Sequence, residues 1–395
     1  MVMVLQPPVA IRNPQSEIGN RRLPGLYIHI PFCRTKCPYC NFYSQTDLTV
    51  VPEFIEALGK EMKMASQGFD GPFDTVYIGG GTPSLLSPEQ IEKILAGIQK
   101  FYRLAPETEF TLEANPADVD LLFLHSLRDL GITRLNLGVQ SFDPQSLTFL
   151  SRRHTDRQAV EAVHASRKAG FDHLGLDLIY GMPGQTMESW LDTLDRATAL
   201  SPEHLSCYQL TFEEETPMGK SCRRGDFSPP GEDDLFRFFM VTSERLGNAG
   251  FIHYEVSNFA RGVLYASRHN QKYWDHTPYL GLGPSAHSFS GSTRWWNTRS
   301  LTTYLARLKS GILPVEEKEN LTGEQLRLEA WSLGLRTSKG IDMEDFSARY
   351  GGAPFSPSSE VMARLQKEGL LTVQDGRIRP TRAGLAIADT LALLL

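Results

Sequence analysis

Six short apolar segments alternate with helical patterns in the first half of the chain, and this alternation restricts the fold more than any other feature. The segments are LYIHI, TVYI, EFTLEA, RLNLGV, HLGLDLIY and HLSCYQL, at residues 26–30, 75–78, 109–114, 134–139, 173–180 and 204–210. Near-continuous apolar strands separated by helices are typical of a parallel sheet covered by helices. If such a sheet curls into a barrel, functional residues belong at the carboxyl ends of its strands. The sequence therefore predicts an α/β fold.

Polar residues or glycines stand at the carboxyl ends of five of these segments. Cys33 follows the first segment, and residues 79–82 (GGGT) follow the second. Glu113 lies on the third, Gln140 follows the fourth, and Asp177 lies on the fifth. One polar strand end would be unremarkable, but five in succession indicate that one rim of the sheet forms a site.

The bulk composition excludes several classes of protein. The chain has 395 residues, 41% of them hydrophobic, and a net charge of −6, which predicts a soluble protein of two or three domains that does not attract nucleic acid. Five cysteines, three of them clustered, do not form a disulfide framework. No apolar run is long enough for a signal peptide or a membrane helix. We expect a cytoplasmic protein, and the sequence leaves peripheral membrane association and homodimerisation open.

Cys33, Cys37 and Cys40 have the spacing C-x3-C-x2-C directly after the first segment. Three thiolates on one loop suit three corners of an iron–sulfur cluster, which normally takes four cysteines. The fourth corner would then be open to a substrate or cofactor. Two alternatives remain: a structural zinc site completed by His29 or another histidine, and three buried cysteines without a metal.

The cysteine spacing, the strand before it, Tyr39 before the last cysteine and GGGTP at residues 79–83 resemble the radical S-adenosylmethionine superfamily. The resemblance implies a partial (β/α)6 barrel, similar to a TIM barrel, and a [4Fe–4S] cluster on the three cysteines. It also implies that the open iron binds the amino and carboxylate groups of S-adenosylmethionine. Electron transfer then cleaves the sulfonium to a 5′-deoxyadenosyl radical.

Within this superfamily, YIHIPFC, GGGTPS, EANP, GVQSF, RRH and DLIYGMPGQT are similar to motifs of oxygen-independent coproporphyrinogen oxidase and its relatives, over about residues 25–315. By position, the resemblance implies contacts to the cluster or to S-adenosylmethionine from Tyr27, Tyr39, Gly80, Gly81, Thr82 and Glu113. Gln140, Arg152 and Asp177 are similar to residues that line a second S-adenosylmethionine position in the oxidase. The alternatives are buried carboxylates that cap turns for Glu113 and Asp177, and a surface charge for Arg152.

Two departures separate this chain from the oxidase pattern. The oxidase has a further cysteine two positions after the third, where this chain has Phe42, and a longer segment before Tyr27. Residues 269–274, HNQKYW, resemble a motif of the haem-chaperone branch of these relatives. The resemblance implies that His269 is an axial haem ligand and that Tyr273 and Trp274 pack against the porphyrin.

These features predict a haem chaperone that binds haem, a [4Fe–4S] cluster and S-adenosylmethionine and delivers haem to apo-haemoproteins. The first alternative is an enzyme that oxidatively decarboxylates coproporphyrinogen III to protoporphyrinogen IX. A zinc-stabilised interaction protein is the second. A structural role for His269 stays open, as do His276 and His287 as haem ligands. Whether the protein is an enzyme stays open too.

The sequence predicts four parts: a leader over residues 1–24, a core over 25–225, an extension over 226–315 and a C-terminal module over 316–395. In the module, helical patterns precede a hairpin at Asp375-Gly376, which is typical of a winged helix. The module is not clearly basic, so we expect it to have a structural or partner-docking role. Residues 213–232, rich in charge, glycine and proline, are expected to form a long loop.

Overall fold

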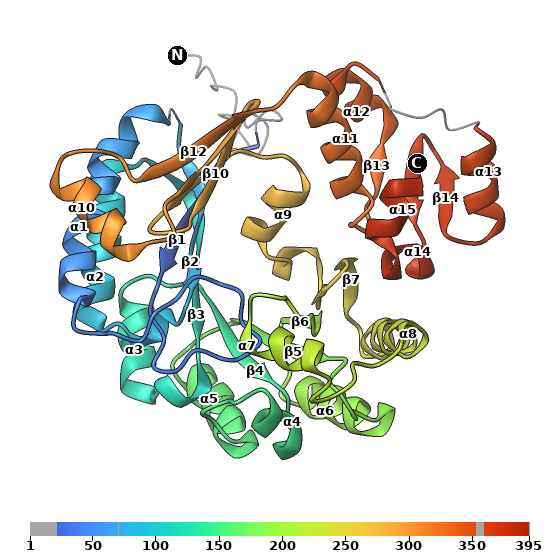
Figure 1. The fold of residues 1–395 in the computed structure, drawn as a ribbon, viewed down its shortest axis with the longest axis horizontal. Helices are drawn as coiled ribbons and strands as arrows, with labels where there is room; N and C mark the ends of the chain where they lie inside the picture. The colour runs from blue at the N-terminus through green and yellow to red at the C-terminus, as the bar shows by residue number, and fades with distance from the viewer. Residues whose placement is uncertain (1–21, 70, 353–358, 395) are drawn as a thin grey trace, which may run out of the picture.

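The computed structural model of the chain describes residues 22–69, 71–352 and 359–394 (Figure 1). The leader expected over residues 1–24 lies almost entirely outside the described residues. Among the described residues, no helix is long and apolar enough to cross a membrane.

The main sheet has the strand order β12-β11-β10-β9-β1-β2-β3-β4-β5-β6-β8-β7. Its centre consists of six parallel strands that follow one another along the chain. They are β1 (Gly25–Ile30), β2 (Phe73–Gly80), β3 (Leu104–Ala114), β4 (Arg134–Gln140), β5 (His173–Tyr180) and β6 (His204–Gln209). The six predicted segments and the α/β class are confirmed.

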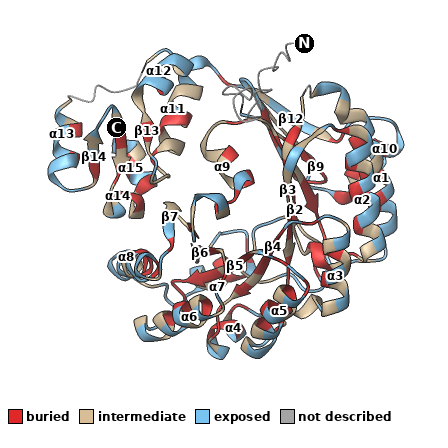
Figure 2. Cartoon of the chain, turned by 180° about the vertical axis from the view of Figure 1, so that it is seen from behind, coloured by how far each residue is buried: buried red, intermediate tan, exposed pale blue. Residues whose placement is uncertain are grey.

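Helices cover the outer face of these strands, and their buried sides face the sheet (Figure 2). They are α1 (Val51–Ala65), α2 (Pro88–Phe101), α3 (Leu121–Asp129), α4 (Pro144–Phe149), α5 (Asp156–Lys168) and α6 (Met187–Ala199). Capping side chains fix several of the starts. The Ser87 hydroxyl accepts from the backbone of Gln90 before α2, and Thr155 does the same for Gln158 before α5. Each pair forms a capping box that satisfies free backbone amides.

Side chains alternate between two environments along the parallel strands. In β1, Leu26, Ile28 and Ile30 are fully buried in the apolar layer under the helices. The intervening Tyr27 and His29 point into the barrel, where the Tyr27 hydroxyl lies 3.1 Å from His29 Nδ1. The other strands place mainly polar side chains at the equivalent inward positions: Thr75, Tyr77, Thr111, Glu113, Arg134, Asn136, Asp177, His204 and Ser206. This interior therefore differs from the branched aliphatic layers that fill a TIM barrel.

The second half of the chain extends both edges of the sheet. At the β1 edge these strands are β9 (Tyr279–Leu282), parallel to β1, and antiparallel β10 (His287–Ser290), β11 (Thr293–Asn297) and β12 (Val315–Asn320). At the β6 edge they are antiparallel β8 (Asn258–Ala260) and β7 (Ile252–Glu255). The remaining helices of this part are α8 (Glu232–Asn248), α9 (Arg268–Trp274) and α10 (Leu301–Lys309). Short 3-10 helices are Ser66–Gly68, Pro83–Leu85, Pro116–Asp118 and Val263–Tyr265.

The expectation of a continuous loop over residues 213–232 is wrong, because this segment contains helix α7 (Pro217–Arg224). The Thr216 hydroxyl caps the first turn, and Pro217 occupies a first-turn position that suits proline. Gly225 ends the helix in the left-handed conformation, with φ of 77°. Proline and glycine thus mark the ends of a helix here rather than a loop.

The C-terminal module has the element order of a winged helix and its own apolar core, which includes Trp331 and Phe346. Its elements are α11 (Gly323–Gly334), β13 (Ile341–Asp342), α12 (Met343–Tyr350), α13 (Glu360–Lys367), β14 (Leu371–Gln374), β15 (Arg377–Pro380), α14 (Arg382–Ala386) and α15 (Ala388–Leu394). The predicted turn at Asp375-Gly376 joins β14 to β15 with positive φ at both residues. The backbone amide of Ser338 donates to the carbonyl of Tyr254 at 3.1 Å, which ties the module to the barrel.

A buried carboxylate joins helix α1 to the extension. Glu61 accepts hydrogen bonds from the Gly283 amide (2.8 Å), Asn297 Nδ2 (2.5 Å) and the Tyr304 hydroxyl (2.6 Å). Burial raises the pKa of Glu61 to about 7, although the three hydrogen bonds act in the opposite direction. The three donors come from the turn after β9, from β11 and from α10, so one side chain organises this edge of the sheet.

Glu61→Ala is expected to lower the free energy of unfolding by about 2–4 kcal/mol, because it removes the acceptor of three buried hydrogen bonds. Glu56→Ala, at an exposed position of the same helix, is the control and should change stability by less than about 0.5 kcal/mol. Urea unfolding followed by circular dichroism measures both. Equal stabilities of the two variants would contradict the assigned role.

Candidate metal and cofactor site

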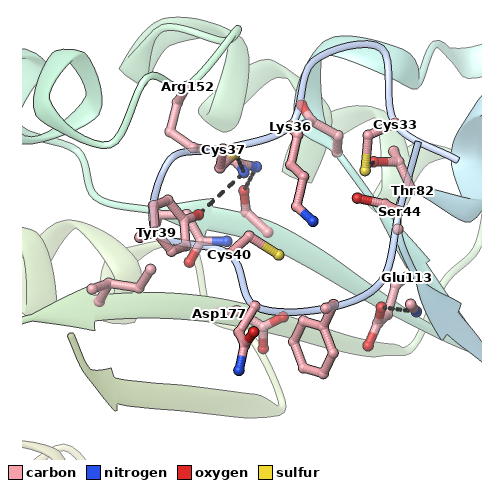
Figure 3. Close-up of a pocket in the computed structure, with 18 of the residues that line it drawn as sticks. Cys33, Lys36, Cys37, Tyr39, Cys40, Ser44, Thr82, Glu113, Arg152 and Asp177 are labelled. Carbon is pink, nitrogen blue, oxygen red and sulfur yellow. Dashed lines mark hydrogen bonds between the residues drawn. The ribbon is translucent and has the colours of Figure 1, made fainter. Parts of the chain in front are cut away.

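A cavity of about 600 Å³ lies at the carboxyl ends of the parallel strands. It brings together all but two of the residues predicted for the site: Cys33, Cys37, Tyr39, Cys40, Gly80, Gly81, Thr82, Glu113, Gln140, Arg152 and Asp177. Figure 3 shows the three cysteines with Glu113, Arg152 and Asp177 around this cavity. The two exceptions are Tyr27 and His269. Phe42, which stands where the oxidase pattern has a further cysteine, lines the same cavity and is 65% exposed.

The loop after β1 carries the three cysteines, all with free thiols. The Cys33 amide donates to the carbonyl of Gln45 at 2.9 Å, which closes the loop. The Thr82 hydroxyl donates to Cys33 Sγ at 3.4 Å. Burial and then the other two thiols raise the pKa of Cys40, against a backbone hydrogen bond at Phe42 that lowers it. The cavity thus holds a group of thiols that would bind a metal centre as thiolates, because a bound metal lowers the pKa of a thiol.

The arrangement engages His29, which the zinc alternative would use as a ligand, in other contacts. Within the part of the chain that the structure describes, no three histidine, cysteine or carboxylate side chains converge as ligands of a single metal ion. His29 Nε2 lies 2.8 Å from the carbonyl oxygen of Tyr43, and its Nδ1 contacts Tyr27, so neither ring nitrogen is free. A zinc ion needs all its ligands about 2.0–2.3 Å from one centre. An iron–sulfur cluster instead accepts each thiolate on a different iron, so the thiols need not converge.

Two carboxylates face the cavity from neighbouring parts of the barrel. Glu113 accepts from the Tyr77 hydroxyl at 2.7 Å and from the Gly80 amide at 3.1 Å. Burial raises the pKa of Glu113 to about 7 and that of Asp177 to about 6. For Asp177, a hydrogen bond with Ser206 and the positive charges of two arginines partly oppose this rise. Both carboxylates are therefore ready to accept hydrogen bonds from hydroxyl or ammonium groups of a ligand.

Several buried polar atoms at this cavity lack hydrogen-bond partners among the described residues. They are Ser44 Oγ, Asn136 Oδ1, Arg152 Nε and Asp177 Oδ1. A buried polar atom without a partner costs about 1–3 kcal/mol, so this set is suited to a ligand rich in polar groups. Ser44 and Asn136 were not predicted. Asn136 could have been found as the polar, inward residue of RLNLGV, whereas no sequence signal indicates Ser44.

Glycines let the β1 and β2 ends approach each other at the cavity. A side chain at Gly81 would place its Cβ 2.5 Å from the carbonyl oxygen of Phe32. Gly80 has φ of 108°, and a Cβ there would lie 2.6 Å from the His29 ring. Only glycine fits these two positions, which explains the second and third glycines of GGGT independently of any ligand.

Arg152 lines the cavity, so the alternative that it is a surface charge is wrong. Its guanidinium donates to the carbonyl of Gly138 at 2.8 Å, and its Nη1 lies 3.4 Å from both Cys37 Sγ and the Tyr39 hydroxyl. Gln140, at the end of β4, adopts a positive φ of 67° and lines the same cavity. The end of β4 and the segment after α4 therefore reach the cysteine loop.

The HNQKYW motif forms helix α9, and its residues face two different directions. His269 is buried inside the barrel, where Nδ1 lies 2.8 Å from Thr75 Oγ1 and Nε2 lies 3.0 Å from the Tyr273 hydroxyl. Burial, and then the charge of Lys272, lower the pKa of His269 to about 3, so the ring is neutral. Trp274 lies on another side of α9. In this structure His269 and Tyr273 therefore do not line the cavity that Trp274 lines, and the role of His269 as a haem ligand stays a prediction.

Trp274 lines a second cavity, of about 500 Å³, between α9, the β7–β8 region and the C-terminal module. Phe346 and Tyr350 line it from the module, and Gln271 lines it from α9. The two further histidines that were considered do not line either cavity. His276 Nδ1 lies 3.2 Å from the Tyr350 hydroxyl, and the His287 ring stacks on Trp296.

Comparison with known proteins agrees with this fold. The family model "Radical SAM superfamily" matches residues 27–197, and "HemN C-terminal domain" matches residues 321–387. The parallel barrel and its cysteine loop thus define a radical S-adenosylmethionine superfamily protein. The solved structure of coproporphyrinogen III oxidase (HemN) from Escherichia coli covers 95% of this chain and 90% of its own, with a TM-score of 0.82 and 23% identity, which shows a shared fold.

Sequence relatives identify the branch of the superfamily. "Heme chaperone HemW" of Mycobacterium tuberculosis is 37% identical over 94% of each chain. The protein of the same name from Bacillus subtilis is 31% identical over 91% of this chain and 95% of its own. The chain belongs to the HemW family of radical S-adenosylmethionine proteins.

Asp177→Asn is expected to stabilise the ligand-free protein at pH 8 by about 1–3 kcal/mol. A carboxylate with a raised pKa in the folded state binds more protons when folded than when unfolded, so its contribution to stability falls as pH rises from about 4 to about 6. Asp177→Asn should lack this pH-dependent loss of stability. Urea unfolding at pH 5 and pH 8 measures the effect, with the exposed Asp172→Asn as control. A variant less stable than the wild type at pH 8 would contradict the expectation.

Proposed function

We propose that this protein is a haem chaperone that binds haem, a [4Fe–4S] cluster and S-adenosylmethionine and delivers haem to apo-haemoproteins. The observation that carries the proposal is one cavity that combines three free thiols with unpartnered polar atoms and two carboxylates of raised pKa. The names of the relatives support the haem part, because proteins called "Heme chaperone HemW" match over nearly their whole length.

In this proposal the core, residues 25–225, holds the cluster through Cys33, Cys37 and Cys40. A bound cluster supplies one-electron chemistry and an open iron for the amino and carboxylate groups of S-adenosylmethionine. Glu113 accepts hydrogen bonds from hydroxyl or ammonium groups of that ligand, and the backbone at Gly81 and Thr82 lies against it. Tyr39 packs beside the cysteines, while Gln140 and Asp177 extend the polar wall. Tyr27 acts indirectly, through its contact with His29 below the GGGT segment.

Haem docks, in this proposal, in the second cavity between the extension (residues 226–315) and the C-terminal module (residues 316–395). Trp274, Phe346 and Tyr350 offer aromatic surface for a flat porphyrin. Four cationic side chains line the same cavity: Arg22, Lys339, Arg349 and Arg377. The three arginines pair with Asp275, Asp342 or Asp345, so the propionates would have to exchange with these carboxylates or bind beside them. His269 faces the barrel interior and does not line this cavity, so it can serve as the axial ligand only if its ring leaves both Thr75 and the Tyr273 hydroxyl and turns toward the haem.

The proposal also covers the surroundings of the protein. Cluster thiolates must stay reduced, which suits the cytoplasm. The acceptors are apo-haemoproteins, and a homodimer would place two haem cavities in one assembly. The module provides one wall of the haem cavity, so an acceptor that contacts the module would reach the haem directly.

Anaerobic reconstitution is expected to load iron and sulfide in the wild type, and the combined Cys33→Ala, Cys37→Ala, Cys40→Ala variant should lose both, because no other thiols line the cavity. Iron and sulfide analysis with absorption spectra measures this. The Cys207→Ala, Cys222→Ala variant is the matched control and should retain the cluster. Stoichiometric zinc in place of iron and sulfide would overturn the radical S-adenosylmethionine proposal.

Haemin titration is expected to produce a Soret band, and Trp274→Ala should weaken haem affinity about tenfold, a loss of about 1.4 kcal/mol. Trp296→Ala, outside the cavity, is the control. If His269 is the axial ligand, His269→Ala should weaken and shift the band, whereas Tyr273→Phe, which frees Nε2, should not weaken it. An unaltered band in His269→Ala would assign His269 to the barrel structure alone.

Incubation with coproporphyrinogen III, S-adenosylmethionine and dithionite tests the enzymatic alternative with the same preparations. The chaperone proposal expects no turnover to protoporphyrinogen IX. Turnover at a catalytic rate, on the order of 1 s⁻¹ or faster, would overturn the proposal in favour of the decarboxylase.

A further inference from the structure

Arg152 directs its positive charge at one of the cluster cysteines. Its Nη1 lies 3.4 Å from Cys37 Sγ, and its Nη2 is anchored at 2.8 Å to the carbonyl of Gly138, at the end of β4. The Arg152 amide donates to the carbonyl of Leu147 at 2.9 Å, which fixes the backbone after α4. The guanidinium is thus held between a rigid strand end and the thiol.

The neighbouring arginine differs in its partners. Arg153 forms an ion pair with the buried carboxylate of Asp118, which also pairs with Arg34 at 3.4 Å. Among the described residues, Arg152 forms no comparable ion pair, although its charge partly opposes the rise in the pKa of Asp177. Two adjacent arginines therefore stand beside the cysteine loop, but only one of them presents its charge to a sulfur.

A hydrogen bond and a positive charge at a ligating sulfur stabilise the reduced state of an iron–sulfur cluster, which carries one more negative charge than the oxidised state. We infer that Arg152 raises the reduction potential of the cluster held by Cys33, Cys37 and Cys40. The inference rests on the proposed cluster, and it gives Arg152 a role beyond a contact to S-adenosylmethionine. Arg152 is a positioning and tuning residue, since it acts through the Cys37 sulfur.

The relevant step is the one-electron reduction of [4Fe–4S]²⁺ to [4Fe–4S]⁺ by an external reductant such as dithionite. The electron goes to the cluster, no bond is formed or broken, and the guanidinium keeps its proton. Arg152 changes only the equilibrium constant of this step. Arg152 contacts Cys37, which is a protein ligand of the proposed cluster. The effect on the reduction potential is therefore expected without S-adenosylmethionine.

The test is an anaerobic potentiometric titration of the reconstituted full chain, followed by electron paramagnetic resonance of the reduced cluster. Arg152→Gln is expected to lower the equilibrium constant for reduction about tenfold, which is about 59 mV for a one-electron couple. Arg152→Lys keeps the charge but not the planar guanidinium, so its reduction potential should lie between those of the wild type and Arg152→Gln. Arg153→Gln should stay close to the wild-type value, because the Arg153 guanidinium pairs with Asp118 and, among the described residues, donates to no sulfur.

The outcomes separate this inference from the proposed function. A wild type that does not load iron and sulfide overturns the cluster proposal itself. Loaded Arg152→Gln with the potential of the wild type, or an equal shift in Arg153→Gln, overturns only the role of Arg152. If Arg152→Gln does not retain the cluster, Arg152→Lys decides: a lowered potential supports the inference, and loss of the cluster there as well overturns it in favour of a role in assembly.

Discussion

The alternation of side chains along the parallel strands is the constraint on which the site depends. One set of positions, such as Leu26 and Ile28 of β1, is fully buried in an apolar layer between sheet and helices. Burial of each such side chain contributes about 1.5–3 kcal/mol. The other set points into the barrel and is mainly polar. Because the outer layer supplies the stability, the interior can keep groups such as Asn136 and Asp177 with unpartnered atoms, which would be unfavourable as a core.

The parts of the fold that depend on short stretches of sequence could be predicted from the sequence. The six strands, most helices and the hairpin at Asp375-Gly376 follow from periodicity and turn residues, and the residues at strand ends do converge on one cavity. The added strands could not be predicted in this way. Gly25 pairs with Tyr279, some 250 residues further along the chain, and no local signal encodes such a pairing. Strands of three to five residues at β7–β11 also carry too few alternating positions to be recognised.

The motif HNQKYW shows where a resemblance has to be combined with geometry. On a helix, residues four apart share a face, so His269 and Tyr273 belong together, while Gln271 and Trp274 share another side. This division could be read from the spacing alone. Which side faces the barrel could not, because it depends on Thr75 and Glu109 of β2 and β3, which hold the start of α9 in place. The motif residues consequently connect the barrel interior with the second cavity instead of forming one pocket.

The carboxylates of the first cavity give the empty protein and the loaded protein different requirements. Burial makes the charged forms of Glu113 and Asp177 unfavourable, which is why their pKa values lie near 7 and 6. A ligand that donates hydrogen bonds to them, or that brings a positive charge, reverses this preference and stabilises the ionised form. The free energy that the empty site loses by holding these groups out of water is thereby recovered on binding. The buried carboxylates that destabilise the empty protein are thus the groups that give a polar, cationic ligand its affinity.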